Sequence, residues 1–303
     1  MQKRPLGNTG MNVSVLGLGT ANAAYLGTEQ ERFGQVLNLL LDAGLNFIDT
    51  AASYPGSEEA LGKLIGHRRA EYFLVSKCGS KVAGAEGSPW SESLITQTVD
   101  RALAEFGTDH LDGMLLHSCD LKTLQKGEAI GALVKAKAAG KIRHIGYSGD
   151  NDAAAFAVTM PEVEILETSI SVVDQANIRL ALPGALKHNV GVIAKRPIGN
   201  AAWRPIDHLP GMYKSYAKTY NDRFAAMDLK PQDVGLTDWA ELALRFTLSQ
   251  PGVATAIIGT TNPDNARKNA EFVAKGPLDP AAVAKIQDAF KKADADGKWA
   301  GQT

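Results

Sequence analysis

Short apolar runs alternate with amphipathic stretches along nearly the whole chain. The runs contain few alternating polar residues, which is typical of strands buried on both faces of a parallel sheet wrapped by helices. Eight runs are predicted to be strands: Val13–Gly19, Asn46–Thr50, Phe73–Lys77, Leu111–His117, Ile142–Ser148, Val163–Ser169, Val190–Pro197 and Ala254–Gly259.

The stretches between these runs have the spacing of helices. Apolar residues recur at helical intervals from Phe33 to Leu41, and Gly44 is placed to end that helix. Further helices are expected over Ser91–Phe106, Ala129–Ala139 and Trp239–Leu248. Eight strand–helix units in this order predict a (β/α)8 TIM barrel, a single α/β domain spanning residues 1–303.

Three segments depart from the alternation. The turn signal Gly7-Asn8-Thr9-Gly10 predicts an N-terminal β-hairpin that caps the bottom of the barrel. The stretch Gly199–Gly235 is expected to be a long structured loop, and such loops usually carry function in barrels. The tail around Ala293–Gly297 is expected to be loosely ordered.

The composition favours a cytoplasmic protein that acts on small molecules. Lys plus Arg (32) almost cancels Asp plus Glu (33), so no global field indicates nucleic acid or an anionic membrane as partner. No apolar run approaches the roughly 18 residues of a membrane span, and no signal-peptide core follows Met1. The only cysteines, Cys78 and Cys119, exclude a disulfide framework, and a redox role for them stays an open alternative to simple burial.

Polar residues stand at the ends of consecutive predicted strands. Asp49, Lys77 and His117 each close an apolar run, and Tyr54 follows Asp49 by five residues. Barrel enzymes assemble their active sites at these carboxyl ends. Alone, a strand-end Asp is often a helix cap and a single His is more often structural, so the prediction rests on all four occurring together.

The four residue types suit proton delivery to a carbonyl oxygen. A free tyrosine has a pKa near 10, about three units too high for efficient donation at neutral pH, and a nearby ammonium lowers it. We therefore expect Tyr54 to be the acid, Lys77 its modulator, Asp49 the partner of that lysine and His117 the residue that orients the substrate oxygen.

The hydride for such a reaction must come from a cofactor. No GxGxxG motif follows a strand, which disfavours a Rossmann site. The last strand instead runs through Gly259-Thr260-Thr261 into a helix beginning near Pro263, where backbone amides can hold phosphate. A plain capped helix is the alternative interpretation. The histidines show no metal-ligand spacing, so no metal is expected.

These residues identify a family resemblance. The sequence resembles the aldo-keto reductases over nearly its full length, and six matches carry the resemblance: Leu6-Gly7-x-Thr9-Gly10 with Val13-Ser14, Asp49-Thr50-Ala51-x-x-Tyr54 with Gly56-Ser57-Glu58, Ser76-Lys77, Leu116-His117, Gly140-Lys141-Ile142-Arg143-x-Ile145-Gly146-x-Ser148, and Gly259-Thr260 through Asn269. The resemblance implies a (β/α)8 barrel with NADPH extended across its rim and an Asp–Tyr–Lys–His tetrad that reduces carbonyls.

The resemblance also implies which residues hold the cofactor. The expected contacts are Gly19, Thr20, Asp49, Ser148, Glu167, Lys195, Arg196, Pro197, Ile198, Gly259, Thr260, Thr261, Asn265 and Asn269. NADP(H) is the expected cofactor because Arg267 and Lys268 lie close to the final motif, and NAD(H) is the alternative.

The chain departs from the family pattern on the nicotinamide side. Glu167 stands where members usually carry a Gln that holds the carboxamide, and Lys195 stands where an aromatic residue commonly stacks. An ionised Glu167 can accept from the carboxamide NH2 but cannot donate to its carbonyl. A cation beside nicotinamide would disfavour its oxidised form, so we hypothesise that Glu167 and Lys195 pair with each other beside the cofactor.

The predicted activity is NAD(P)H-dependent reduction of an aldehyde or ketone to an alcohol. Two alternatives remain: oxidation of a sugar or polyol by the same site, and a cofactor-sensing regulatory binding protein. The expected partner is a small carbonyl or sugar, and the expected state is a monomer or weak homo-oligomer. Loop aromatics that either line a substrate pocket or pack locally are Tyr25, Trp90, Trp203 and Tyr213.

Overall fold

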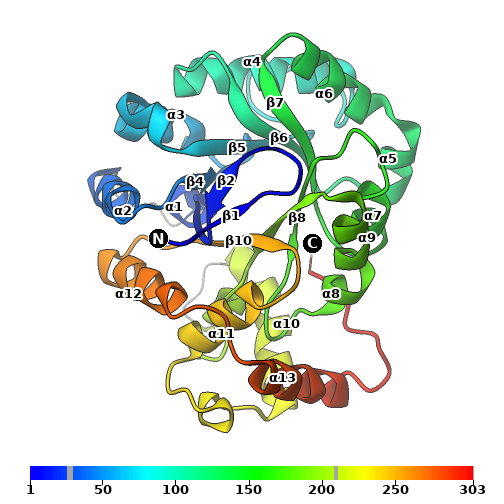
Figure 1. The fold of residues 1–303 in the computed structure, drawn as a ribbon. Helices are drawn as coiled ribbons and strands as arrows, with labels where there is room; N and C mark the ends of the chain where they lie inside the picture. The colour runs from blue at the N-terminus through cyan, green and yellow to red at the C-terminus, as the bar shows by residue number, and fades with distance from the viewer. Residues whose placement is uncertain (26–29, 208–210, 303) are drawn as a thin grey trace.

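Eight parallel strands close into a barrel in the order β10-β3-β4-β5-β6-β7-β8-β9 (Figure 1). The computed structural model describes residues 1–25, 30–207 and 211–302. The barrel strands are β3 Leu16–Gly19, β4 Phe47–Asp49, β5 Phe73–Cys78, β6 Leu111–His117, β7 Ile142–Ser148, β8 Ile165–Ser169, β9 Gly191–Lys195 and β10 Val253–Ile258. The predicted (β/α)8 barrel is confirmed, and because all strands run in parallel their carboxyl ends share one rim.

Helices surround the barrel on its outside (Figure 1). Those that the structure describes are α1 Ala21–Tyr25, α2 Gln30–Asp42, α3 Ser57–Ile65, α4 Glu92–Phe106, α5 Leu121–Lys126, α6 Glu128–Ala138, α7 Asn151–Ala157, α8 Ala176–Leu180, α9 Leu182–His188, α10 Gly211–Met227, α11 Trp239–Leu248, α12 Pro263–Ala274 and α13 Pro280–Ala293. Short 3-10 turns span Gly66–Glu71, Gly199–Ala201 and Pro231–Val234. The ends of α4 follow local chemistry: the Ser91 side chain caps the amide of Leu94, and Gly107 ends the helix at φ 64°.

An N-terminal hairpin closes the bottom of the barrel, as predicted. Its strands β1 (Lys3–Pro5) and β2 (Asn12–Ser14) are antiparallel, and its apolar residues join the barrel interior. Gly7 sits so close to the barrel that a Cβ there would lie 2.3 Å from the Gly191 nitrogen. The predicted strand Val13–Gly19 is therefore two elements, with its first residues in the hairpin and Leu16–Gly19 in the barrel.

The segment Gly199–Gly235 is not a long loop. Helix α10 occupies much of it and packs on α13. The buried positions Ala217, Tyr220, Phe224 and Met227 recur at intervals of three or four residues, which forms one helix face. That stripe is small and aromatic within an otherwise polar sequence, so the helical pattern is weak in the sequence.

The C-terminal tail is also more ordered than the sequence predicts. After α13 the chain makes a hydrogen-bonded turn from Asp294 to Gly297 and returns to the barrel beside β8 (Figure 1). The tail backbone then bonds to rim residues: Asn151 Nδ2 donates to the Gly301 carbonyl at 3.0 Å, and the Gln302 amide donates to Asp174 Oδ2 at 3.1 Å. Backbone groups rather than side chains make these contacts, so the pattern of apolar residues gives no sign of them.

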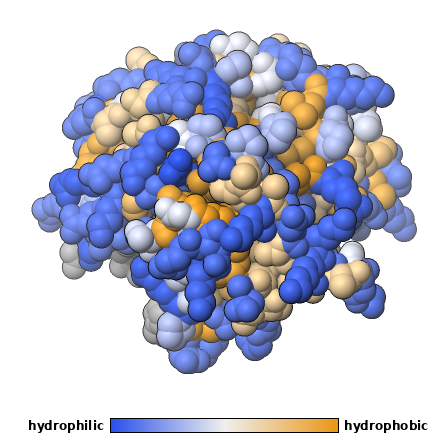
Figure 2. Space-filling model, turned by 60° about the horizontal axis from the view of Figure 1, so that its bottom comes forward, coloured by the Kyte–Doolittle hydropathy of each residue, from blue (hydrophilic) through white to orange (hydrophobic). Residues whose placement is uncertain are grey.

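The outer surface is mainly polar. Figure 2 shows hydrophilic residues over most of one face, with hydrophobic residues gathered in smaller patches between them. None of the described helices is long and apolar enough to span a bilayer.

Candidate active site

The four polar residues predicted to act together lie at one sector of the rim. Asp49 ends β4, Lys77 lies on the neighbouring strand β5, and His117 ends β6. Tyr54 lies in the turn between β4 and α3, where its amide donates to the Ala51 carbonyl at 2.9 Å. The strand order therefore brings residues that are up to 68 positions apart in the chain to adjacent strand ends.

Lys77 and Asp49 form a buried ion pair. Lys77 Nζ lies 2.6 Å from Asp49 Oδ1 and 2.7 Å from Oδ2, and it donates to the Thr50 carbonyl at 2.9 Å. Their side chains are 0% and 3% exposed. Although burial alone would lower it, the carboxylates of Asp49 and Glu167 raise the pKa of Lys77, so this lysine carries a fixed positive charge.

Tyr54 and His117 present the accessible part of this group. Their rings stand edge to face with centroids 5.8 Å apart, and Lys77 Nζ lies 5.6 Å from the centroid of the Tyr54 ring. Tyr54 and His117 are partly accessible, whereas Asp49 and Lys77 are buried. The phenol and the imidazole are therefore placed to meet an incoming ligand, with the ion pair behind them.

Burial outweighs the predicted effect of Lys77 on the tyrosine pKa. Burial raises the pKa of Tyr54 above its ordinary value, and the charges of Asp49 and Glu167 act in the same direction. Lys77 lowers it, as predicted, but only offsets part of this rise. The phenol is therefore protonated at neutral pH, which is the state that a proton donor requires.

His117 is neutral in this setting. Burial and the positive charges of Lys77, Lys195 and Arg196 hold the pKa of His117 well below its usual range. Its Nδ1 lies 3.3 Å from the Ser53 hydroxyl. If Ser53 donates that hydrogen bond, Nε2 carries the proton and is the ring's donor. A neutral imidazole can then hydrogen-bond a substrate oxygen without adding charge.

Glu167 lies beside the tetrad rather than beside Lys195. Its Oε2 is 3.2 Å from Lys77 Nζ, and its Oε1 accepts from the Ser148 hydroxyl at 3.3 Å. The approach of Lys77 lacks hydrogen-bond geometry, and no described residue donates a hydrogen bond to Oε2. Burial and the facing Glu167 carboxylate raise the pKa of Asp49.

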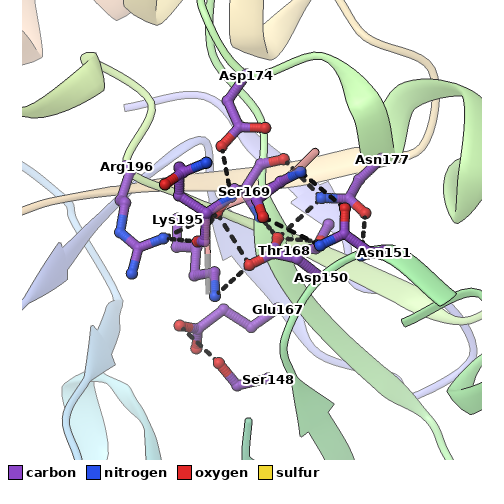
Figure 3. Close-up of polar contacts among 12 residues, drawn as sticks. Ser148, Asp150, Asn151, Glu167, Thr168, Ser169, Asp174, Asn177, Lys195 and Arg196 are labelled. Carbon is purple, nitrogen blue, oxygen red and sulfur yellow. Dashed lines mark hydrogen bonds and ion pairs between the residues drawn. The ribbon is translucent and has the colours of Figure 1, made fainter. Parts of the chain in front are cut away.

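The hypothesised Glu167–Lys195 ion pair is wrong. Lys195 Nζ instead lies 2.9 Å from Asp150 Oδ2 (Figure 3). The Asp150 carboxylate is held in place, because its other oxygen accepts from the Ser169 amide at 2.7 Å and from the Asn177 side chain at 2.8 Å. This fixed carboxylate in the loop after β7 neutralises Lys195, and Glu167 pairs with Lys77 instead.

Arg196 extends this cationic edge. It adopts φ 53°, and its guanidinium donates to Ser169 Oγ at 3.1 Å and to the Gln302 carbonyl (Figure 3). The next residues serve the fold: the Pro197 carbonyl accepts from Thr247 Oγ1 at 3.4 Å, and Ile198 packs against the core. Arg196 thus adds a cation beside the Lys195–Asp150 ion pair at the end of β9.

The ends of β10 and β3 complete the other side of the rim. Gly259, Thr260 and Thr261 lead into α12, which Asn262 caps by accepting from the Asp264 amide at 2.8 Å. Asn265 is exposed, and Asn269 is buried. Arg267 pairs with Asp264 at 2.9 Å on the exposed first turn. The first turn of α12 therefore carries a side-chain cap at Asn262 and an exposed Arg267–Asp264 ion pair.

Gly19 and Thr20, at the end of β3, differ in the groups that they could present to a cofactor. Gly19 lies opposite Asp49 in the β3–β4 register. The Thr20 hydroxyl bonds to Thr50 and Ser57 at 2.8 Å each and is buried. That side chain therefore serves the fold, and the Thr20 amide likewise donates to the Asp49 carbonyl at 3.0 Å.

The cysteines and loop aromatics contribute packing. Cys78 and Cys119 are both 2% exposed, and burial raises the pKa of Cys119 to about 12, so this thiol stays protonated at neutral pH. Trp203 stacks on Trp239 with centroids 5.9 Å apart, and Trp90 covers Gly79. The side chains of Tyr25 and Tyr213 lie outside the described part of the chain.

The sequence prediction missed three contributors to the site: Ser53, Asp150 and the tail. Asp150 follows the end of β7 by two residues, so the rule that selected Ser148 would have found it with a slightly wider window. Ser53 lies beside Tyr54 in the β4–α3 turn, but its contact with His117 depends on the fold. The tail bonds to the rim through its backbone, and its side-chain signal in the sequence is Trp299, which packs on Phe290 with ring centroids 5.2 Å apart.

Comparison with known proteins supports the resemblance. The sequence model of the Aldo/keto reductase family matches residues 15–291. The uncharacterized oxidoreductase YqkF of Bacillus subtilis is 28% identical over 96% of this chain and 97% of its own length. L-galactose dehydrogenase of Arabidopsis thaliana is 25% identical, over 90% of this chain and 88% of that enzyme. The holo structure of an aldo-keto reductase from Bacillus halodurans superposes with a TM-score of 0.81 at 26% identity, covering 96% and 97% of the two chains.

Proposed function

Because this chain belongs to the aldo/keto reductase family, we propose that it reduces an aldehyde or ketone to an alcohol through Tyr54, His117, Lys77 and Asp49. One observation carries the proposal. The partly accessible phenol and imidazole meet in front of a buried Lys77–Asp49 ion pair, which is an arrangement suited to polarising and protonating a carbonyl oxygen.

The residues at the rim fit a nicotinamide dinucleotide. Glu167 Oε2 is a buried acceptor without a described hydrogen-bond donor, which suits the NH2 group of a carboxamide. Lys195 and Arg196 at β9, and the N-terminus of α12 beyond Gly259 and Thr260, suit the phosphates. When bound, the reduced nicotinamide would supply the hydride to the carbonyl carbon.

The residues of the chain would then manage the oxygen and its proton. His117, neutral, donates a hydrogen bond that orients the carbonyl. Tyr54 transfers its phenolic proton to the oxygen as negative charge develops there. Lys77 stabilises the phenolate that remains, and Asp49 holds the ammonium in place behind the ring. Solvent returns a proton to Tyr54 after the alcohol leaves.

We further propose NADP(H) as the preferred cofactor. Lys268 is exposed on the first turns of α12, and Arg267 forms an exposed ion pair with Asp264. Exposed pairs of this kind are weak, so a ribose phosphate can recruit the arginine. NAD(H) is the alternative, and the ratio of Michaelis constants for the two cofactors decides between them.

Oxidation of a sugar or polyol is the second candidate. The same residues operate in reverse, with the Tyr54 phenolate as base. The similarity to L-galactose dehydrogenase, a named sugar dehydrogenase, favours it.

A substrate panel tests both candidates. The purified protein is incubated with each reduced cofactor and a set of aldehydes, ketones and sugar carbonyls, and with each oxidised cofactor and sugars or polyols, while absorbance at the nicotinamide band is followed. We expect cofactor consumption with at least one carbonyl. Turnover only with hydroxyl substrates would favour the second candidate, and no turnover with any would contradict the proposal.

A further inference from the structure

Two carboxylates approach a single ammonium at the centre of the site. Lys77 Nζ lies 2.6 Å from Asp49 Oδ1 and 3.2 Å from Glu167 Oε2. Both carboxylate side chains are 3% exposed and the lysine side chain is 0% exposed, so water screens none of the three. Asp49 comes from β4, Lys77 from β5 and Glu167 from β8, so the cluster spans the inside of the barrel.

The neighbouring charged residues form contacts of their own beside this cluster. On β6, His117 is neutral. After β7, Asp150 faces Lys195 from β9, and the two form their own pair at 2.9 Å. Arg196 is directed to Ser169 and the Gln302 carbonyl at the outer edge (Figure 3). Among these groups, Lys77 is the one that forms ion pairs with both Asp49 and Glu167.

Glu167 also has an unfilled acceptor. Its Oε2 is buried and receives no hydrogen bond from the described residues. A buried carboxylate oxygen in that position needs either a hydrogen-bond donor supplied by a ligand or a nearby positive charge that keeps it ionised. Among the described residues, the donor to its second oxygen is Ser148 at 3.3 Å, which is a long hydrogen bond.

We propose that Glu167 is a positioning residue that acts through Lys77. It shares the ammonium with Asp49, and its carboxylate adds negative charge that acts on the Tyr54 phenol. The inference rests on the proposed function and deepens it. The Glu167 carboxylate opposes formation of the Tyr54 phenolate and favours a positively charged, oxidised nicotinamide ring.

Both effects favour the chemical step of reduction, and the second also slows release of the oxidised cofactor. A phenol that stays protonated to higher pH is a donor over a wider range of pH, which supports reduction. A site that favours the positive ring holds oxidised cofactor more tightly than reduced cofactor, which promotes hydride departure and slows release of the oxidised form. A neutral side chain at position 167 would remove both effects together.

Glu167→Gln tests this with a matched control, Glu164→Gln. Glu164 stands just before the start of β8 and pairs with His144 at 2.8 Å and with Lys137, away from the tetrad. The two variants make the same chemical change three residues apart, one just before β8 and one at its middle. Glu167→Asp is the conservative variant, which keeps the charge and should restore most of the wild-type behaviour.

The first readout needs no cofactor. Tyrosines are replaced by fluorotyrosine, whose phenol is more acidic, and the resonance of Tyr54 is assigned by its loss in Tyr54→Phe. In a fluorine NMR titration, Glu167→Gln should shift phenolate formation at Tyr54 by about one pH unit or more to lower pH. Glu164→Gln should leave it in place.

The second readout is the ratio of dissociation constants for oxidised and reduced cofactor, measured by calorimetry. Glu167→Gln should move that ratio about tenfold toward the reduced form. Equal weakening of both forms would indicate a merely structural role and would overturn the proposal, as would a Tyr54 titration identical to wild type. A shifted titration in a protein that binds neither cofactor would contradict the proposed function and leave the charge coupling through Lys77 intact.

Discussion

The rings of Tyr54 and His117 meet edge to face, with centroids 5.8 Å apart and an interplanar angle of 82°. This arrangement directs two neutral donors, a phenol and an imidazole, toward a shared space in front of the buried Lys77. A carbonyl oxygen has two lone pairs and can accept from both donors at once. The proposed chemistry follows from this convergence.

The neutrality of His117 predicts a specific pH dependence. Because burial and the nearby cations hold the pKa of His117 well below 6.5, its ring gains no proton between about pH 6 and 8. The kcat/KM for carbonyl reduction should therefore show no ionisation near 6.5. A pH–rate profile measures this, and a limb near 6.5 that disappears in His117→Gln would contradict the neutral role.

Removing Lys77 should destabilise the fold as well as the activity. Lys77→Met leaves the carboxylates of Asp49 and Glu167 buried without their cation, and breaking a buried pair costs about 3–5 kcal/mol. Urea denaturation should show this loss in the free energy of unfolding. Lys63→Met removes an exposed ion pair on α3 and should leave the unfolding curve unchanged. Equal effects of the two substitutions would argue against a buried charge cluster.

Glu58 should make stability depend on pH. Burial raises the pKa of Glu58 to about 7 in the folded protein, against 4.5 for a free group. The stabilisation of the protonated form is thus complete below about pH 4.5 and is lost as pH rises to about 7, a change on the order of 3 kcal/mol. Glu58→Gln should abolish this decline in urea unfolding experiments, while Glu59→Gln on the exposed face of the same helix should retain it.

Much of this architecture follows from local patterns. The barrel strands are readable because both faces are buried and their apolar runs are nearly continuous. Asp49, Lys77 and His117 are readable because each closes such a run. The ion-pair partners of Glu167 and Lys195 cannot be predicted from the sequence. Lys195 can pair with either Asp150 or Glu167, and the outcome depends on which carboxylate the fold has already fixed with hydrogen bonds.

The tail should influence the cofactor edge of the site. A Cβ added at Gly301 would meet Asn177 Nδ2 at 2.8 Å and Asp150 Cβ at 2.9 Å, so Gly301→Val should displace the segment that bonds to Arg196. We expect faster hydrogen exchange at residues 299–302 and weaker cofactor binding. Gly131→Val, where a Cβ meets no neighbour within 4 Å, is the control. Unchanged exchange and affinity in Gly301→Val would show that the tail contacts do not matter.

The central claim is that Tyr54 delivers the proton, and single-turnover kinetics of Tyr54→Phe test it most directly. The enzyme is loaded with reduced cofactor and mixed rapidly with a carbonyl that the wild type accepts, while nicotinamide absorbance is followed. The account predicts an unchanged cofactor dissociation constant and a chemical step slowed by about 10²–10⁴-fold, the usual contribution of a positioned general acid. A Tyr54→Phe protein that oxidised its cofactor at the wild-type rate would contradict the account.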